Sequence, residues 1–142
     1  MWNALDYIDF NVTDGGQLFI SLYNDQGRLS KVWKLIKKSY VKTPKFLRFL
    51  IVFPCLIALW GPATIRDFLI FKPFATWRNY NNLRGMDAYR DLLDWVGGYP
   101  FEVASPDKIF NFYKNKNYNL QNLITISGGH GCNEYVFKKR SK

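Results

Sequence analysis

The chain has 142 residues, 48% hydrophobic and 18% aromatic, a composition that argues against disorder and supplies enough apolar side chains for a buried core. Its two cysteines, Cys55 and Cys132, are far apart and it has one histidine, so the sequence predicts neither a disulfide scaffold nor a metal site. The formal charge is +9, but eight of the twenty Lys and Arg residues fall in residues 28–48 without any acid, leaving twelve to balance eleven Asp and Glu.

These features also set expectations for partners and location. The basic residues are concentrated in one segment and no known nucleic-acid-binding motif accompanies them, so we expect no nucleic-acid partner. Unpaired thiols indicate a reducing compartment. Residues 1–10 carry two acids instead of a cationic start before an apolar core, so we expect a cytoplasmic protein.

The N-terminal part of the chain predicts a short helix, a glycine turn and a strand. Residues 1–10 place apolar side chains at helical spacing, and residues 14–16 (DGG) are turn formers. The run QLFISLY at 17–23 predicts a buried strand. In open α/β sheets ligands bind beyond the carboxyl ends of the strands, so the next polar residues are either site residues or caps of the following helix: Asn24, Asp25 and Gln26.

Residues 28–42 predict an amphipathic helix. One face carries Leu29, Val32, Trp33, Ile36 and Tyr40. The other face carries Lys31, Lys34, Lys38 and Lys42. The lysine face is either solvated or lies against an anionic membrane surface.

The segment after this helix is apolar and interrupted by prolines. The run FLIVFPCLIALW at 49–60 is twelve residues long, whereas a membrane-spanning helix needs about 20. Residues 44–84 contain four prolines, each of which we expect to break or open a helix. The sequence therefore favours short, angled helices and a buried or interfacial helix pair over a transmembrane span.

The last third of the chain predicts two helices and two strands. Residues 88–96 predict a helix that ends at Gly97-Gly98, and Ser105-Pro106-Asp107 begins another. Residues 120–126 and 134–138 predict strands joined as a hairpin by a glycine-rich loop. His130 lies in that loop, either as a catalytic residue or as an exposed side chain without a role.

Three long strings in this sequence resemble one bacterial subgroup of class I S-adenosylmethionine-dependent methyltransferases, similar to the polyprenyl-hydroxyphenyl methylases of ubiquinone synthesis. They follow the patterns V-x-x-G-G-x-L-F-I-x-L-Y-N-D-Q-G, D-W-x-G-G-Y-P-F-E-V-A and G-C-N-E-x-V-F, read at 12–27, 94–104 and 131–137. Position 130 departs from the subgroup, where an aliphatic residue is more common than histidine. Residues 44–80 are the loosest part of the likeness.

The resemblance implies a fold and a missing part. The fold is α/β, the C-terminal part of a Rossmann-like methyltransferase sheet (strands five to seven), with residues 28–90 as a helical insertion or lid inside a partial domain of residues 1–142. The family holds S-adenosylmethionine with a glycine-rich turn after its first strand and an acid after its second, and neither is present here. We therefore expect no cofactor-binding residues and a chain that is inactive without an N-terminal half or another partner, such as a second copy.

The resemblance also implies which residues face the methyl acceptor, a small molecule whose identity and methylated atom stay open. The acceptor side of the cleft would be lined by Tyr23, Asn24, Gln26, Trp95, Tyr99, Phe101 and Glu102. Glu102 would orient the acceptor or remove its proton; alternatively it pairs with a nearby cation or caps a loop. A rival interpretation is a non-enzymatic, membrane-peripheral or interaction protein that uses the basic helix 28–42.

Overall fold

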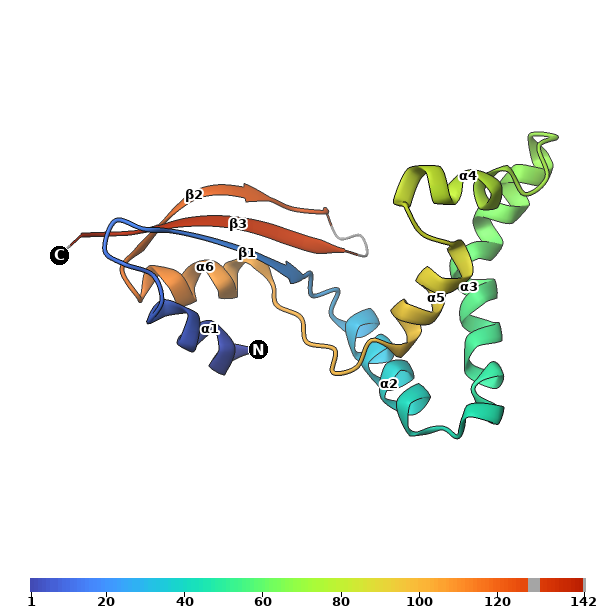
Figure 1. The fold of residues 1–142 in the computed structure, drawn as a ribbon, viewed down its shortest axis with the longest axis horizontal. Coiled ribbons are helices and arrows are strands. Elements are labelled where there is room, and N and C mark those ends of the chain that lie inside the picture. The colour runs from blue at the N-terminus through green and yellow to red at the C-terminus, as the bar shows by residue number, and fades with distance from the viewer. Residues whose placement is uncertain (128–130, 142) are drawn as a thin grey trace. The chain divides into compact units, whose positions relative to one another are not determined.

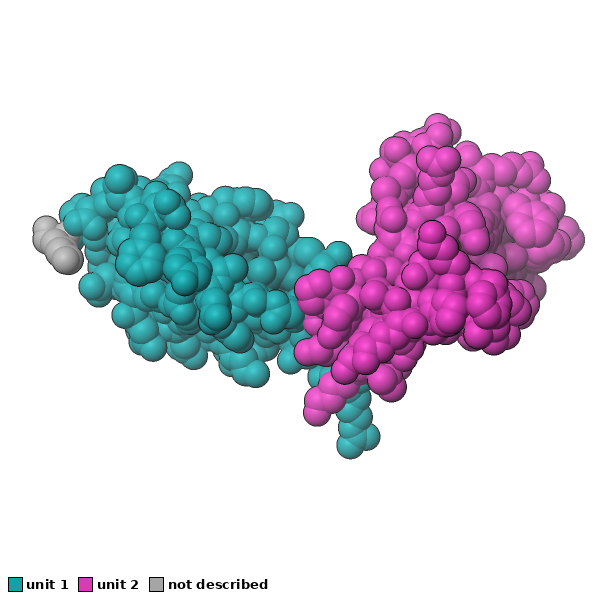
Figure 2. Space-filling model, turned by 60° about the horizontal axis from the view of Figure 1, so that its bottom comes forward, with its two compact units in different colours: residues 1–30, 102–142 teal, residues 31–101 magenta. Residues whose placement is uncertain are grey.

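The computed structural model describes residues 1–127 and 131–141, and the chain is a mixed α/β protein, as the sequence predicts. It divides into two compact units, coloured separately in Figure 2. The first unit combines residues 1–30 with residues from 102 onward, and it contains the sheet. The second unit is residues 31–101 and is helical in its regular structure.

The first unit is built on a three-stranded antiparallel sheet. Its strands are β1 (Gln17–Tyr23), β2 (Tyr118–Ile124) and β3 (Cys132–Lys139), in the order β1-β3-β2. The predicted hairpin is confirmed, because β2 and β3 pair antiparallel with Leu120 opposite Phe137. β3 also pairs along the whole of β1, from Gln17 opposite Lys138 to Tyr23 opposite Cys132.

Two helices cover one face of this sheet. α1 (Trp2–Asp9) and α6 (Pro106–Lys114) both lie below the strands in Figure 1. Alternate residues of β1 and β3 point into the core beneath the sheet, as the period of two requires. The buried core consists of Leu5, Leu18, Ile20, Ala104, Ile109, Tyr113, Tyr118, Tyr135 and Phe137.

The second unit contains the long apolar helix, and here the sequence prediction is wrong. The elements are α2 (Arg28–Lys42, which begins in the first unit), a 3-10 turn (Lys45–Leu47), α3 (Phe49–Leu69), α4 (Ala75–Arg84) and α5 (Ala88–Gly97). α3 is one helix of 21 residues that runs through Pro54 and Pro62. Each proline removes one N–H donor, but its fixed φ is close to that of a helix. The backbone hydrogen bonds of α3 therefore continue on either side of each proline.

A buried carboxylate joins α3 to α4. Asp67, near the end of α3, accepts hydrogen bonds from the backbone N–H of Thr76 at 2.6 Å and from the Thr76 hydroxyl at 2.8 Å. The Thr76 backbone hydrogen bond outweighs burial and holds the pKa of Asp67 below its ordinary value. α4 then folds back along α3, with the rings of Trp60 and Trp77 4.3 Å apart.

Candidate functional site

The predicted site residues divide between the two units. Tyr23, Asn24, Gln26 and Glu102 belong to the first, and Trp95, Tyr99 and Phe101 to the second. His130 lies outside the described residues.

In the first unit, the carboxyl end of β1 is tied to the segment that follows Glu102. The backbone N–H of Ala104 donates to the carbonyl of Tyr23 at 3.1 Å, and that of Asp25 donates to the carbonyl of Ala104 at 3.3 Å. These bonds form a short parallel bridge between Asn24 and Ala104. The bridge brings Tyr23 and Asn24 next to the strand-like segment that begins at Glu102.

A buried asparagine that the sequence analysis missed completes this end of the sheet. Asn133, on β3, is 1% exposed; its amide donates to Asn24 Oδ1 at 3.0 Å, and its Oδ1 accepts from the N–H of Ile126 at 3.3 Å. The signal was available, because position 133 shares the buried face of β3 with Tyr135 and Phe137. A polar residue on that face predicts a specific hydrogen-bonding task.

Replacing this amide is expected to destabilise the first unit. Asn133→Ala leaves Asn24 and the N–H of Ile126 without their partner, which costs about 1–3 kcal/mol of unfolding free energy. Urea unfolding followed by circular dichroism measures the change. Gln121→Ala, on the exposed part of β2, is the control and should change it by less than about 0.5 kcal/mol. Equal effects of the two substitutions would contradict this assignment.

The polar residues after β1 mostly build a turn. The carboxylate of Asp25 accepts from the N–H of Gly27 at 2.8 Å, and Gly27 has φ +63°. The N–H of Gln26 donates to the Ser30 hydroxyl at 2.8 Å. These contacts lead the chain into α2, and for Asp25 and Gln26 they agree better with the capping alternative than with a ligand site. Asn24 differs, because its side chain is bonded to Asn133.

Glu102 has a cationic neighbour. Its Oε2 lies 2.5 Å from the amino group of Met1, and its side chain stays half exposed. The alternative interpretation of Glu102, pairing with a cation, matches this contact. Its role toward an acceptor stays a prediction, since a half-exposed carboxylate keeps an open side.

In the second unit, two of the predicted residues enclose a buried lysine. Lys37, on α2, is 2% exposed, and its Nζ donates to the backbone carbonyl of Trp95. The amine lies 3.9 Å from the ring centroid of Trp95 and 4.9 Å from that of Phe101. Trp33 packs edge-on against Trp95 with centroids 5.5 Å apart. The third predicted residue, Tyr99, is partly exposed.

Burial of this cluster changes the ionisation of two groups. Desolvation lowers the pKa of Lys37 to about 8, and the thiolate form of Cys55 acts in the opposite direction on it. Burial raises the pKa of the Cys55 thiol. Lys37 was missed because the predicted apolar face included Leu29 and Val32, which are more than half exposed. A signal was present in the sequence, because Lys37 follows Trp33 by four residues and therefore lies on the same face of the helix.

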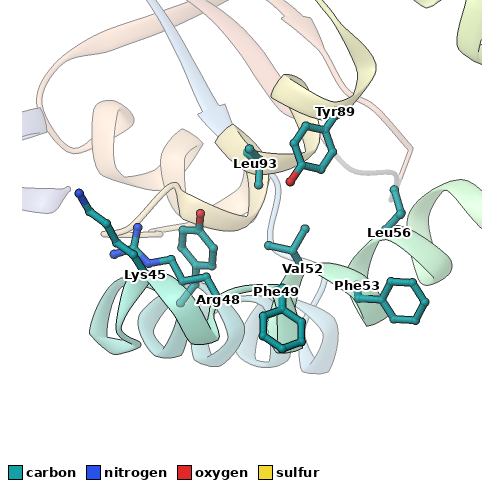
Figure 3. Close-up of a pocket in the computed structure, with 9 residues that line it drawn as sticks. Lys45, Arg48, Phe49, Val52, Phe53, Leu56, Tyr89 and Leu93 are labelled. Atoms are coloured by element: carbon teal, nitrogen blue, oxygen red, sulfur yellow. The ribbon is translucent and has the colours of Figure 1, made fainter.

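An open groove of about 440 Å³ lies between α3 and α5 (Figure 3). Lys45 and Arg48 lie at one end and Leu56 at the other, with Tyr89 and Leu93 of α5 facing α3. The remaining lining residues are Tyr40, Phe49, Val52 and Phe53. Two cationic side chains beside apolar lining residues fit a ligand that is anionic at one end and apolar along its length.

The described residues contain no group of three or more His, Cys, Asp or Glu side chains that could hold a metal ion. Comparison with known proteins gave no match to a family model, a curated protein or a solved structure.

Proposed function

We propose that this chain forms the acceptor-side part of a class I S-adenosylmethionine-dependent methyltransferase. The observation that carries the proposal is the pairing of β3 with β1 from Gln17↔Lys138 to Tyr23↔Cys132. The resemblance expects a closing hairpin beside the fifth strand, and the β2–β3 hairpin adds to β1 in that way. The three long sequence strings supply the second line of support.

The cofactor does not fit the residues present. β1 is followed by the turn NDQG, which has one glycine, and the Asp25 carboxylate is already bonded to the N–H of Gly27. A nucleoside site needs backbone approach at a glycine-rich turn and an acid directed at the sugar hydroxyls. We expect the residues that bind the cofactor to come from another polypeptide segment.

The role of this chain would be to position the acceptor. Methyl transfer requires close in-line placement of the nucleophile, and a proton must leave an O–H or N–H acceptor. In this proposal the exposed side of the Glu102 carboxylate accepts that proton. The phenol of Tyr23, at the end of β1, forms a hydrogen bond with a hydroxyl group of the acceptor. In this scheme both residues bind and orient the acceptor.

The open face of the sheet supports the need for a partner. Among the described residues, β1 pairs along its length with β3, and its other edge meets only the bridge to Ala104 at its carboxyl end, so the rest of that edge is available to a further strand. Phe19 points away from α1 and α6 and is 62% exposed. Sheets of this class are covered on both faces, so a complementary half would bury Phe19.

The proposal is tested by complementation. By isothermal titration the 142-residue chain should bind no S-adenosylmethionine in the micromolar range. Adding a polypeptide that carries the glycine-rich half of a methyltransferase of this subgroup should produce binding. Phe19→Ser should weaken that assembly, whereas Phe10→Ser, exposed at the end of α1, should leave it unchanged. Micromolar binding by this chain alone would overturn the proposal.

A further inference from the structure

α3 exposes an apolar face that a monomer in water would be expected to cover. The face consists of Phe49, Leu50, Phe53, Ile57, Ile65 and Phe68, each more than half exposed. No charged residue lies between Arg48 and Arg66, so the face is continuous over this length. The opposite face carries the buried residues Val52 and Cys55. Contiguous exposed apolar surface of this kind marks a binding surface.

The charge distribution favours an anionic bilayer as the occupant of this face. α2 and the turn after it expose Lys31, Lys34, Lys38, Lys42 and Lys45, and residues 28–48 contain no acid. A second copy docked here would bring the same cationic segment beside its own. Anionic lipid headgroups instead attract it, by about 1 kcal/mol for each Lys or Arg near the surface.

The start of α3 has the layout of a headgroup site. Lys45 and Arg48 lie at one end of the groove (Figure 3), and Phe49 and Phe53 are among its lining residues. Arg48 is held there, because its Nε donates to the carbonyl of Thr43 at 3.1 Å and its guanidinium lies 4.8 Å from the ring centroid of Tyr40. Cations beside an apolar floor place a phosphate at the water boundary and an acyl chain along the helix.

The helix packing favours insertion in the plane of the membrane over a span. By length and composition Lys45–Leu69 could cross a bilayer, since it has 25 residues and contains an 18-residue stretch with a mean hydropathy of 1.9. However, α4 is packed along α3, where Trp77 Nε1 donates to the Thr64 hydroxyl at 2.9 Å. α4 carries Arg78 and Arg84, and the Tyr80 hydroxyl donates to Asp91 of α5. A span would draw these charges into hydrocarbon at high cost.

We propose that the helical unit binds an anionic membrane surface with α3 lying in the plane of the interface. The uncovered face of α3 enters the acyl region, and Lys45 and Arg48 contact lipid phosphates. α4 and α5 remain on the aqueous side. This inference goes beyond the methyltransferase proposal and does not depend on it.

Vesicle flotation of the full chain tests the inference. The protein should float with vesicles of phosphatidylcholine mixed with phosphatidylglycerol, less so at high salt, and poorly with phosphatidylcholine alone. Ile57→Glu should lower partitioning at least tenfold. Leu83→Glu is the control, because Leu83 is exposed on α4, outside the proposed face, and should leave partitioning unchanged. Circular dichroism confirms that both variants fold.

The headgroup site has its own variant. Replacing Lys45 and Arg48 together by Gln should lower partitioning about thirty-fold at low salt, since two cations contribute about 2 kcal/mol and 1.4 kcal/mol is tenfold. Release of the bound protein by alkaline carbonate is expected of an in-plane helix. Resistance to carbonate would overturn the in-plane arrangement.

Two other occupants give distinct results. If the chain does not float with either vesicle and Ile57→Glu converts an oligomer to a monomer in light scattering, the face belongs to a second copy. If it does not float and Ile57→Glu prevents assembly with the glycine-rich half, the face belongs to that partner. Either result overturns the membrane inference. Failure of the Phe19→Ser assembly test, in contrast, affects only the methyltransferase proposal.

Discussion

Phe137→Ala is expected to lower the unfolding free energy of the first unit by about 3–5 kcal/mol. Phe137 is 0% exposed in the centre of β3, with its ring 4.8 Å from that of Tyr113 and 5.9 Å from that of Tyr135. Removing the ring loses apolar burial and leaves a cavity among aromatic neighbours that cannot collapse onto it. For a unit of this size the loss approaches the whole stability.

The matched control is on the other face of the same sheet. Phe19→Ala removes the same ring from β1, but Phe19 faces away from the helices, and we expect a loss below about 1 kcal/mol in the isolated chain. Hydrogen exchange read by mass spectrometry separates the units, and the Phe137 variant should lose protection in residues 1–30 and 102–141 first. Equal losses for the two variants would contradict the one-sided core.

The elements that the sequence predicts well are those whose pattern is local. The helix at 28–42 and the strand at 17–23 have the predicted bounds, because a periodic apolar pattern ends at turn residues in both cases. The two closing strands begin about two residues earlier than predicted, because their bounds are set by strand pairing, of β2 with β3 and of β3 with β1, and not by their own composition.

The errors arise where local composition does not decide the outcome. Pro54 and Pro62 predicted breaks, yet α3 continues through both, because each proline removes one N–H donor while its fixed φ stays close to that of a helix. The rotation of α2 was also misjudged. The apolar residues mark one face of this helix, but the buried face, with Ser30, Trp33 and Lys37, is rotated away from it and leaves Leu29 and Val32 exposed.

The candidate site shows the same division. Asn24 was found because polar residues after a strand are a local signal. Its partner Asn133 lies 109 residues away, and only the antiparallel pairing of β1 with β3 brings the two amides together. The groove between α3 and α5 likewise depends on tertiary contacts between Val52, Leu56, Tyr89 and Leu93. No spacing rule in the sequence connects these positions.

Lys37→Met is expected to remove a pH dependence from the stability of the helical unit. The pKa of Lys37 is about 8 in the folded chain, against 10.5 as the reference value. Between these values the unfolded chain binds more protons, so unfolding free energy rises as pH increases from about 8 to about 10.5. Below pH 8 the penalty of holding the buried ammonium is fully present.

The size of the effect follows from the pKa. A fall from 10.5 to about 8 corresponds to about 3 kcal/mol, and solvent screening at the edge of the cluster reduces our expectation to about 2 kcal/mol. The stability of the wild-type chain relative to Lys37→Met should therefore rise by about 2 kcal/mol from pH 7 to pH 10.5. Met keeps the length of the side chain, so packing against Trp95 and Phe101 is largely preserved.

The control for this experiment is the next residue along the helix. Lys38 is exposed on α2, and Lys38→Met should show the pH profile of the wild-type chain. Cys55 also titrates in this range, since burial raises its thiol pKa, so all three proteins are compared in a Cys55→Ala background. A wild-type profile parallel to that of Lys37→Met would mean that the amine reaches water in the folded chain. In that case Trp95 and Phe101 would not enclose it, and the aromatic cluster that organises α2 against α5 would have to be open.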